Sequence, residues 1–446
     1  MLFSLQSYLD SFLDWEAHLQ KAGPEAFSLN DFEKLIVLFG RPDDKLKFAH
    51  IAGSKGKGST AIFLASILRS AGYRVGLYTS PHLYSVRERI RILSPGGTPS
   101  SFEGMISEEE FFDRVKYYSA PVDEFRKSGG RVTYYEFLTA IAVSYFAANN
   151  VEVVVLETGL GGRLDATNVF ETSVCGITSI GLEHTQILGD TLSKIAAEKA
   201  GIVKSPLQKV VLAPQEPEAM AVLEARAREF YLSPTVVGKD LPFQIVSQDE
   251  AGTCFEAQGR RNYQNLYIKL LGRHQVVNAA TALAMAEDLE MYGLLLTEEA
   301  VQKGLVEALW PARFEMVHKK PYVVLDCAHT LESARALAQT FKAVFPGRKA
   351  TLVFGASQDK NIPAILKELG AVSDRVILTK ANHARACDFS KFNAHEVLGQ
   401  APVPKVATVP AAMTQALDSA RDTDIILVAG SVFVAAEARE FLNVPV

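Results

Sequence analysis

The sequence has few cysteines, and it lacks both long apolar runs and long basic runs. Its 446 residues include four cysteines, none of them in a CxxC pair. This spacing excludes a disulfide scaffold or a zinc ribbon and predicts free thiols in a reducing compartment, the cytoplasm. No stretch approaches the roughly 18 apolar residues of a membrane span. The N-terminus shows no basic segment and no cleavage site, so we expect no signal peptide.

Neither sign of charge is in large excess. The chain has 46 Lys and Arg residues against 51 Asp and Glu, a formal net charge of -5. This weak acidity, without basic runs, argues against nucleic acid as a partner but leaves room for a local basic pocket that binds a small anion. What the chain does have is a hydrophobic fraction of 48% and a length typical of about two or three soluble domains.

The first half of the chain alternates predicted strands with predicted helices. Residues up to about 40 have helical spacing, and the strands that follow are expected at residues 48–52, 74–79, 151–156 and 174–180. Such alternation predicts a parallel sheet covered by helices on both faces. The stretch 207–272 differs, because its short strands point to a small antiparallel appendage. Those strands are expected at residues 243–246, 253–257 and 266–271, before a helix at 276–289.

The alternation restarts after residue 310. Five short apolar runs predict five strands, at residues 322–325, 351–354, 375–379, 405–409 and 425–428. Five strand–helix units in so short a stretch predict a second, smaller doubly wound (Rossmann-like) domain. The fold class is therefore α/β, with one domain over residues 1–306 and another over residues 307–446.

A glycine-rich loop follows the first predicted strand and precedes a helix. Its glycines permit positive φ and a close backbone approach, and the helix N-terminus adds partial positive charge, so the loop suits phosphate. Lys57 is placed to reach the β- and γ-phosphates of ATP, and a hydroxyl from Ser59 or Thr60 to reach Mg²⁺. The spacing departs from the usual Walker pattern, and a flexible Gly/Ser turn is the alternative. The predicted ATP-binding residues here are Gly53, Ser54, Lys55, Gly56, Lys57, Gly58, Ser59 and Thr60.

Other candidate residues allow two interpretations each. Glu157 and His184 follow successive predicted strands, where ligands sit in open α/β sheets, but a helix-capping Glu and a surface His fit the spacing equally well. Lys199 lies late in a predicted helix, where its positive charge interacts favourably with the helix dipole. Tyr134 and Tyr135 are suited to stack on an aromatic ring or to start a buried helix. Ser431 is either part of a carboxylate cradle or a helix cap.

Eight motifs, in this order, closely resemble the folylpolyglutamate synthases and dihydrofolate synthases of the Mur ligase superfamily. They are Gly53-Ser-Lys-Gly-Lys-Gly-Ser-Thr60, Thr79-Ser-Pro-His-Leu83, Thr133-Tyr-Tyr-Glu136, Glu157-Thr-Gly-Leu-Gly-Gly-Arg-Leu-Asp-Ala-Thr-Asn168, Glu198-Lys-Ala-Gly201, Gly272-Arg-His-Gln275 with Asn278, Trp310-Pro-Ala-Arg313 and Asp326-Cys-Ala-His329. Five residues depart from the family pattern, among them Cys327 and Thr330, which replace the Gly and Asn that commonly flank Ala328-His329. Lys55 stands where bacterial members more often carry Asn, Glu183 where Asp is usual, and Ala312 where Gly is usual.

The resemblance implies roles for individual residues. The first domain would be a P-loop ATPase domain in which Lys57, His184 and Lys199 are catalytic, with Lys199 carbamylated by CO₂. Further ATP contacts would come from Asn278, Arg313 and Asp326, and ligands for Mg²⁺ (two ions) from Ser59, Ser80, Glu157 and His184. The folate-binding residues would be His82, Thr133, Tyr134, Tyr135, Glu136, Leu164, Asp165 and Ala166. The glutamate-binding residues would be His329 and Ser431.

The activity that the resemblance implies is ATP-dependent amide formation. A substrate carboxylate would attack the γ-phosphate to give an acyl phosphate, and an amino group would then displace phosphate. We expect L-glutamate to be joined to dihydropteroate and to the γ-carboxylate of folates by one bifunctional, monomeric enzyme. The alternatives are a single-activity member, a Mur-type amino-acid ligase, or a P-loop switch that hydrolyses ATP only to change partners. Which pterin acids are accepted and how long a glutamate chain is built stay open.

Overall fold

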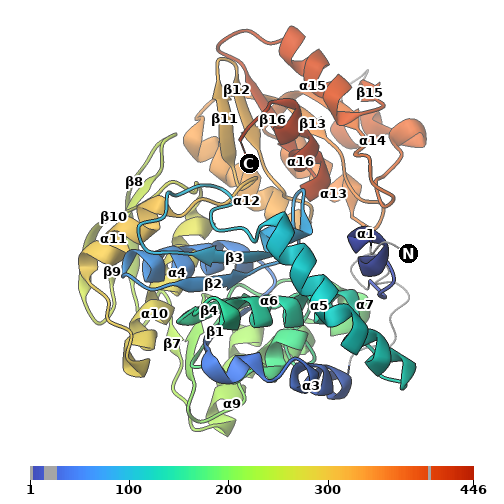
Figure 1. Cartoon of the computed structure of the whole chain (residues 1–446). Helices are drawn as coiled ribbons and strands as arrows, with labels where there is room; N and C mark the ends of the chain where they lie inside the picture. Colours follow the sequence, from blue (N-terminus) through green and yellow to red (C-terminus); the bar gives the residue numbers. More distant parts are fainter. Residues whose placement is uncertain (1–3, 15–27, 400–402, 446) are drawn as a thin grey trace. The chain divides into compact units, whose positions relative to one another are not determined.

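The structure of the chain is a computed structural model that describes residues 4–14, 28–399 and 403–445. The chain divides into two compact units, which are treated separately below (Figure 1). Unit 1 comprises Met1–Gln244, Glu256–Leu266 and Val277–Ala308, and unit 2 comprises Ile245–Phe255, Tyr267–Val276 and Leu309–Val446. Two segments before residue 307 thus group with unit 2. The division into two domains, 1–306 and 307–446, stays a prediction.

Unit 1 is built on a seven-stranded sheet with the order β3-β2-β4-β1-β5-β6-β7. All neighbouring strands run parallel except β2 and β3. The strands are β1 (Lys47–Ala52), β2 (Val75–Tyr78), β3 (Ile90–Leu93), β4 (Val153–Glu157), β5 (Val174–Ile177), β6 (Lys209–Leu212) and β7 (Thr235–Val236). Strands β2, β4 and β5 are buried along their whole length, as expected for a parallel sheet covered on both faces.

Helices cover both faces of this sheet. They are α1 (Leu5–Leu9), α3 (Leu29–Leu38), α4 (Lys57–Ser70), α5 (Glu108–Lys127), α6 (Tyr134–Ala148), α7 (Thr185–Leu188), α8 (Leu192–Ala200), α9 (Pro217–Glu229), α10 (Arg273–Leu289) and α11 (Glu298–Glu307), with short 3₁₀ turns η3 (Pro42–Lys45), η4 (Val86–Arg89), η5 (Ala166–Val169) and η6 (Glu290–Tyr292). One core joins α3, α5 and α6 to β1, β2 and β4 (Figure 1). A second core joins α8 and α9 to β5 and β6.

A separate three-stranded sheet has the order β10-β9-β8. Its strands are β8 (Phe243–Gln248), β9 (Thr253–Gln258) and β10 (Asn262–Ile268). Loops of three or four residues join consecutive strands, so the sheet is antiparallel. The predicted appendage is therefore confirmed, although its last strand begins at Asn262 rather than near 266. In β10 Tyr263, Leu266 and Ile268 are buried, whereas the first four residues include three exposed polar ones, so an apolar run was a poor guide to where this strand begins.

The stretch 207–272, predicted to differ from the rest, also contains two strands that were not predicted. Strands β6 and β7 extend the parallel sheet of unit 1 beyond β5, with α9 between them. Three other bounds also differ. Strand β5 ends at Ile177 rather than 180, α4 begins at Lys57, within the loop predicted at residues 53–60, and the helix expected before residue 40 is described only at residues 5–9 and 29–38. Residues 15–27 lie outside the described part.

Unit 2 contains a six-stranded sheet with the order β11-β12-β16-β13-β14-β15. Its strands are β11 (Glu315–Lys319), β12 (Tyr322–Leu325), β13 (Ala350–Phe354), β14 (Ser373–Thr379), β15 (Lys405–Val406) and β16 (Ile425–Ala429). Five strands are parallel, and the edge strand β11, which the sequence analysis missed, is antiparallel to β12. The fourth predicted strand is short because Thr408 already caps the next helix.

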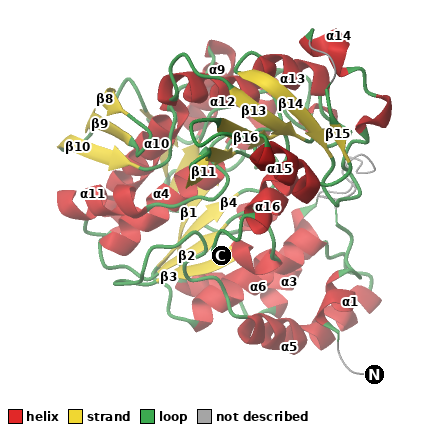
Figure 2. Ribbon diagram, turned by 90° about the horizontal axis from the view of Figure 1, so that it is seen from above, coloured by secondary structure: helices red, strands yellow, loops and turns green. Residues whose placement is uncertain are grey.

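Helices lie on both faces of the unit 2 sheet, which confirms the doubly wound prediction. They are α12 (Leu331–Val344), α13 (Ile362–Gly370), α14 (Ala394–Leu398), α15 (Val409–Asp418) and α16 (Val432–Phe441), with the 3₁₀ turn η7 (Phe389–Lys391). Figure 2 shows α12 and α13 on one side of β13, β14 and β16, and α15 and α16 on the other. Among the described residues, no helix is long and apolar enough to cross a membrane.

Candidate active site

The glycine-rich loop connects β1 to α4, as predicted, and two of its glycines are required by their surroundings. Gly53 has φ +148° and Gly56 has φ +90°. A Cβ on Gly53 would overlap the Thr178 hydroxyl, and a Cβ on Gly56 would overlap the Asn278 amide oxygen. Asn278, on α10, therefore packs directly against this loop. Any side chain at either glycine would force the loop away from β5 or α10.

Two backbone amides at the start of the loop already have protein partners. The amides of Ser54 and Lys55 both donate to the Ser179 carbonyl at 3.0 Å, and the Ser54 hydroxyl donates to the Gly181 carbonyl at 3.0 Å. The amides of the first turn of α4 have no partner within the helix, as at any helix N-terminus. The cradle for an anion is therefore the later part of the loop, from Gly56 into α4, rather than its whole length.

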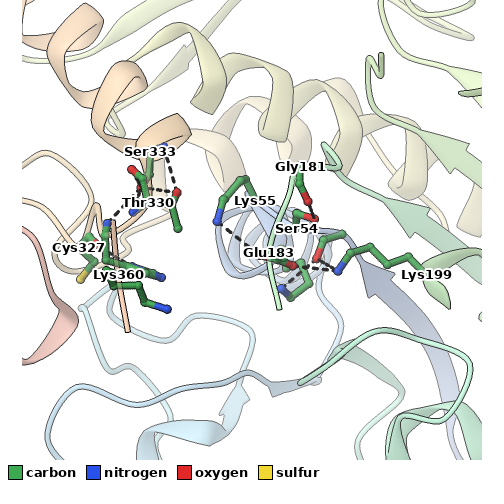
Figure 3. A network of polar contacts seen from close by, with 12 residues as sticks. Ser54, Lys55, Gly181, Glu183, Lys199, Cys327, Thr330, Ser333 and Lys360 are labelled. Atoms are coloured by element: carbon green, nitrogen blue, oxygen red, sulfur yellow. Dashed lines mark hydrogen bonds and ion pairs between the residues drawn. The ribbon is translucent and has the colours of Figure 1, made fainter. Parts of the chain in front are cut away.

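Two lysines beside the loop, Lys55 and Lys199, pair with the carboxylate of Glu183 (Figure 3), and Lys57 contacts the same loop. We call Lys55, Lys57, Lys199 and Glu183 the lysine–glutamate cluster. The Lys199 Nζ lies 3.0 Å from Glu183 Oε1 and donates to the Gly53 carbonyl at 2.7 Å. The Lys55 Nζ lies 3.4 Å from Glu183 Oε2, and Lys57 donates to the Gly53 carbonyl at 3.1 Å. With three positive charges against one negative charge, the cluster is suited to receive an anion.

Burial changes the protonation of this cluster. The Lys199 side chain is 1% exposed, and this burial lowers its pKa to about 8 although Glu183 opposes the change. A sizeable fraction of Lys199 is therefore a neutral, nucleophilic amine slightly above neutral pH. Burial alone would raise the pKa of Glu183, but Lys199, followed by Lys57 and Lys55, lowers it to about 2. Glu183 is therefore ionised throughout the physiological range.

The predicted metal ligands Glu157 and His184 come at the end of β4 and after β5, the two strands that flank β1. Glu157 closes β4 and is paired with Ile51 of β1, so it reaches the sheet edge that carries the loop. Its Oε2 accepts a hydrogen bond from the Ser80 amide at 3.1 Å. His184 precedes α7 with φ +48°. Among the described residues, no three His, Cys, Asp or Glu side chains gather as a metal-binding cluster.

These residues nevertheless fit Mg²⁺. This ion typically takes one or two carboxylates and completes its shell with water and substrate phosphates. Glu157 supplies a buried carboxylate, and Ser59 lies in the first turn of α4. The hydroxyls of Thr60 and Thr158 are buried without a hydrogen-bond partner, so oxygen donors remain available beside the loop.

The predicted folate residues around the start of α6 have structural roles. Thr133 and Glu136 form a capping box, in which the Thr133 amide donates to Glu136 Oε2 at 2.7 Å and the Glu136 amide to the Thr133 hydroxyl at 3.2 Å. Tyr134 and Tyr135 begin this helix and pack, half-buried, against the core. Both tyrosines thus lie at a helix start, and their contact with folate stays a prediction. The Tyr135 hydroxyl also donates to the Glu157 carbonyl at 3.3 Å.

Arg89 links two of the predicted folate residues. Its guanidinium donates to His82 Nδ1 at 3.0 Å and lies 5.9 Å from the centre of the Tyr134 ring. Arg89 is 2% exposed. His82 and Tyr134 therefore lie in one neighbourhood, although no motif in the sequence joined them.

The predicted folate residue Asp165 is held inside its own turn. Its Oδ2 accepts from the Leu160 amide at 2.9 Å, and its Oδ1 accepts from the Thr167 amide at 3.0 Å and hydroxyl at 2.6 Å. The flanking Leu164 is half-buried and Ala166 is buried. Both oxygens of Asp165 thus hold the turn, which favours a framework role, and a contact with substrate stays a prediction.

A buried histidine supports this turn and was missed at the sequence level. His50, on β1, has its Nε2 2.7 Å from the Thr167 hydroxyl. Burial, with a smaller effect of Lys204, lowers the pKa of His50 to about 3, so the ring is neutral. Because the Thr167 hydroxyl donates to Asp165, His50 Nε2–H is the donor to Thr167. A single histidine before a glycine-rich loop carries no motif that could have indicated this chain of bonds.

In unit 2, the predicted residues lie at the carboxyl ends of two paired strands. Asp326 and His329 follow β12 and Ser431 follows β16, its parallel neighbour. Asp326 accepts from the Phe314 and Ala328 amides, both at 2.8 Å. Burial raises the pKa of Asp326 and Arg313 opposes this. The Ser431 hydroxyl accepts from the Phe433 amide at 3.1 Å, so the helix-cap alternative is present in the structure.

His329 is exposed, and its Nδ1 lies 2.8 Å from the Cys327 carbonyl. Ala312, where the resembled family usually has Gly, has φ +53°. That angle lies in the left-handed region that favours glycine. The structure brings Arg313, Asp326, His329 and Ser431 to unit 2 and the remaining predicted residues to unit 1.

Comparisons with known proteins agree with this geometry. The Mur ligase middle domain matches residues 127–286, and the Mur ligase glutamate ligase domain matches residues 312–432. The dihydrofolate synthase/folylpolyglutamate synthase of Bacillus subtilis is 34% identical over 431 residues, which cover 93% of this chain and 95% of that protein.

Solved structures agree as well. Mycobacterium tuberculosis folylpolyglutamate synthase complexed with ADP is similar with a TM-score of 0.87 and 30% identity, over 99% of this chain and 98% of that chain. Escherichia coli FolC in complex with DHPP and ADP has a TM-score of 0.82 and 29% identity, over 99% and 98% of the two chains.

Proposed function

The chain belongs to the dihydrofolate synthase/folylpolyglutamate synthase family of Mur ligases, and from this premise we propose its substrates and mechanism. Members of this family are ATP-dependent acid–amino-acid ligases, and so is this chain. Its substrates are L-glutamate with dihydropteroate and with the γ-carboxylate of folates, joined by one bifunctional enzyme. The observation that carries the proposal is the glycine loop with three lysines converging beside it.

The reaction proceeds in two steps. The substrate carboxylate attacks the γ-phosphorus of ATP, which forms an acyl C–O–P bond and releases ADP. The amino group of glutamate then adds to the acyl carbon, and phosphate leaves as the amide forms and the amine loses a proton. Catalysis of the first step consists of positioning and charge neutralisation, which Lys57 and the amides of the first turn of α4 supply.

Mg²⁺ supplies further charge neutralisation on the phosphates when it is bound. Glu157, the hydroxyls of Ser59 and Ser80, and His184 would hold two such ions. Of these, Glu157 is supported by its burial beside the loop and its bond to the Ser80 amide. No general base of the Ser–His–Asp type is needed, because the carboxylate substrate is already a nucleophile at neutral pH.

Lys199 is carbamylated in the active enzyme. Its neutral amine attacks CO₂, a C–N bond forms and one proton is lost, so a cation becomes an anionic oxygen donor. The lowered pKa of about 8 supports this role, because only the neutral amine reacts. With ¹³C-labelled bicarbonate, a carbamate carbon signal should appear in the wild type and be absent from Lys199→Gln. A spectrum identical for the two proteins would refute the modification.

Residues in unit 2 take part in binding. We assign Arg313 and Asp326 to ATP, together with Asn278 from unit 1, and His329 and Ser431 to the incoming glutamate. The folate cleft is formed by His82, Thr133–Glu136 and Leu164–Ala166. His329 and Ser431 follow two paired parallel strands, β12 and β16, and so lie at the same edge of the sheet, which supports the glutamate assignment. We also propose that the enzyme is a monomer and acts in the cytoplasm.

The decisive experiment identifies the products. Purified protein is incubated with ATP, Mg²⁺, glutamate and either dihydropteroate or tetrahydrofolate, and products are identified by mass. Glutamate addition to both acids is expected, and addition to one alone indicates a single-activity enzyme. If phosphate release depends on neither acid nor glutamate, the chain is a nucleotide switch and the ligase proposal fails.

A further inference from the structure

Glu183 is an acidic residue surrounded by lysines beside the nucleotide loop. It is the carboxylate of the lysine–glutamate cluster, and its two oxygens contact lysines from two elements (Figure 3). Lys55 belongs to the loop after β1, whereas Lys199 lies at the end of α8. A single side chain thus connects the loop to the helix that carries the proposed modified lysine.

The two ion pairs of Glu183 are unequal. Lys199 is 3.0 Å from the carboxylate, is 1% exposed and also donates to the Gly53 carbonyl. Lys55 is 3.4 Å away and 29% exposed. A longer, more exposed ion pair is weaker because solvent screens it, so an incoming anion displaces Lys55 from Glu183 more easily than Lys199.

The loop backbone allows Lys55 to move alone. Its amide and that of Ser54 both donate to the Ser179 carbonyl, so the main chain is anchored to the strand-end segment that follows β5. Only the side chain has to rotate to leave Glu183. The change therefore costs no rearrangement of the glycines, which have no room to shift against Thr178 and Asn278.

We propose that Glu183 is the resting counterion of the nucleotide loop and that it releases Lys55 to the phosphates when a nucleoside triphosphate binds. Glu183 keeps its shorter ion pair with Lys199 during this exchange, as long as Lys199 is an unmodified ammonium. Glu183 is a positioning residue, because it acts through the two lysines. The inference deepens the proposed function, since it rests on the loop binding a nucleoside triphosphate.

The test is a double-mutant cycle on nucleotide binding rather than on turnover. The ligand is the β,γ-methylene analogue of ATP, measured by calorimetry without Mg²⁺. In wild type, Lys55 must leave Glu183 before it contacts phosphate, so Lys55→Asn should weaken binding by only about twofold. In the Glu183→Gln background Lys55 is already released, and Lys55→Asn should weaken binding by about tenfold. Glu183→Gln alone should tighten binding.

The coupling between the two sites decides the matter. If Lys55→Asn weakens analogue binding by the same factor in both backgrounds, Glu183 acts only through its negative charge near the phosphates, and the proposal is overturned. Glu198→Gln is the matched control, since Glu198 neighbours Lys199 on α8 and forms a 2.9 Å pair with Arg163. Glu198→Gln should leave analogue binding unchanged, both alone and in the Lys55→Asn background.

A second variant covers the case in which Glu183→Gln fails to fold. Glu183→Asp keeps the charge but shortens the side chain by one methylene, so it cannot reach both lysines. It should tighten analogue binding by about threefold, and unchanged or weaker binding contradicts the proposal. If the wild type binds no analogue at all, the proposed function fails. If the wild type binds it but the cycle is additive, only the inference about Glu183 fails.

Discussion

The nucleotide loop and the turn that holds Asp165 follow neighbouring strands of one sheet, yet their polar groups are arranged in opposite ways. At the loop, two lysines share one carboxylate and a third contacts the Gly53 carbonyl, so positive charge is left over. At the turn, both oxygens of Asp165 are used by the turn itself, with His50 supporting it through Thr167. The loop therefore has excess positive charge that an anionic ligand can pair with, whereas the hydrogen bonds of the turn are already made within the protein. Five predictions test this contrast, beginning with the largest effect.

Lys57→Ala should lower turnover by about a thousandfold or more, with little loss of fold. The ammonium neutralises charge that develops on the transferred phosphoryl group, and no other group replaces it. Steady-state kinetics and a thermal unfolding curve measure the two properties. Retained turnover would contradict the assignment of the loop.

Gly53→Ala should disrupt the loop itself. A Cβ there overlaps the Thr178 hydroxyl, so we expect a loss of about 2–3 kcal/mol in the free energy of unfolding and at least tenfold weaker nucleotide binding. The matched control is Gly72→Ala, because Gly72 also has positive φ but nothing within 4 Å. This control should cost about 1 kcal/mol and leave binding unchanged. Equal effects of the two variants on binding would remove the requirement for glycine at position 53.

The lysine–glutamate cluster predicts a pH dependence of stability. The folded-state pKa of Lys199 is lowered to about 8 from its ordinary value of 10.5. Between these values the unfolded chain holds more protons, so the free energy of unfolding rises with pH. Without bicarbonate, the wild type should gain about 2–3 kcal/mol relative to Lys199→Met from pH 8 to pH 10.5. Urea unfolding at several pH values measures this, and parallel curves would show that Lys199 titrates normally.

Thr167→Val should affect the framework turn. It leaves the His50 Nε2–H without its partner and removes the hydroxyl bond to Asp165, which keeps its two backbone amide donors, at a cost of about 1–2 kcal/mol. Because the turn belongs to the proposed folate cleft, the KM for the pterin acid should rise about fivefold while the KM for ATP stays the same. Thr167→Ser keeps the hydroxyl and should restore the wild-type KM. If both KM values rise together, the turn serves the nucleotide loop as well.

Ala312→Gly should have the smallest effect. Ala312 has φ +53°, where a Cβ is disfavoured and glycine is not. Relief of this strain should raise the free energy of unfolding by about 0.5–1 kcal/mol, although the greater freedom of glycine in the unfolded chain offsets part of the gain. Chemical denaturation measures the change. A destabilised variant would show that packing of the Ala312 methyl group outweighs the strain.

The two regions also differ in how well they could be predicted. The nucleotide loop is a local feature, because strand, glycines, lysine and helix follow one another within about a dozen residues, and it was found directly. Glu183 and His50 act through residues distant in the chain, and neither lies in a motif that names its partner. Thr133, Glu136 and Ser431 show a third case, since a capping side chain and a ligand-binding side chain have the same sequence pattern at a helix start.

Strand prediction followed the same division. Buried strands such as β1 and β4 are continuous apolar runs and were placed to within a residue or two. Strands β3, β6, β7 and β11 were missed and β10 was misplaced, because short or edge strands are specified mainly by their neighbours. The fold class survived these errors, since it depends on the alternation of elements and not on their exact ends.

The sequence by itself determined the α/β class, the glycine loop and the family, because each depends on short-range order or on the joint order of motifs. Only the tertiary structure decided which charges meet. It joined Lys55 and Lys199 through Glu183, and it tied His50 to Asp165 through Thr167. The physical reason is that ion pairs and buried hydrogen bonds act over a few ångströms in space, and chain folding brings together atoms that no spacing in the sequence connects.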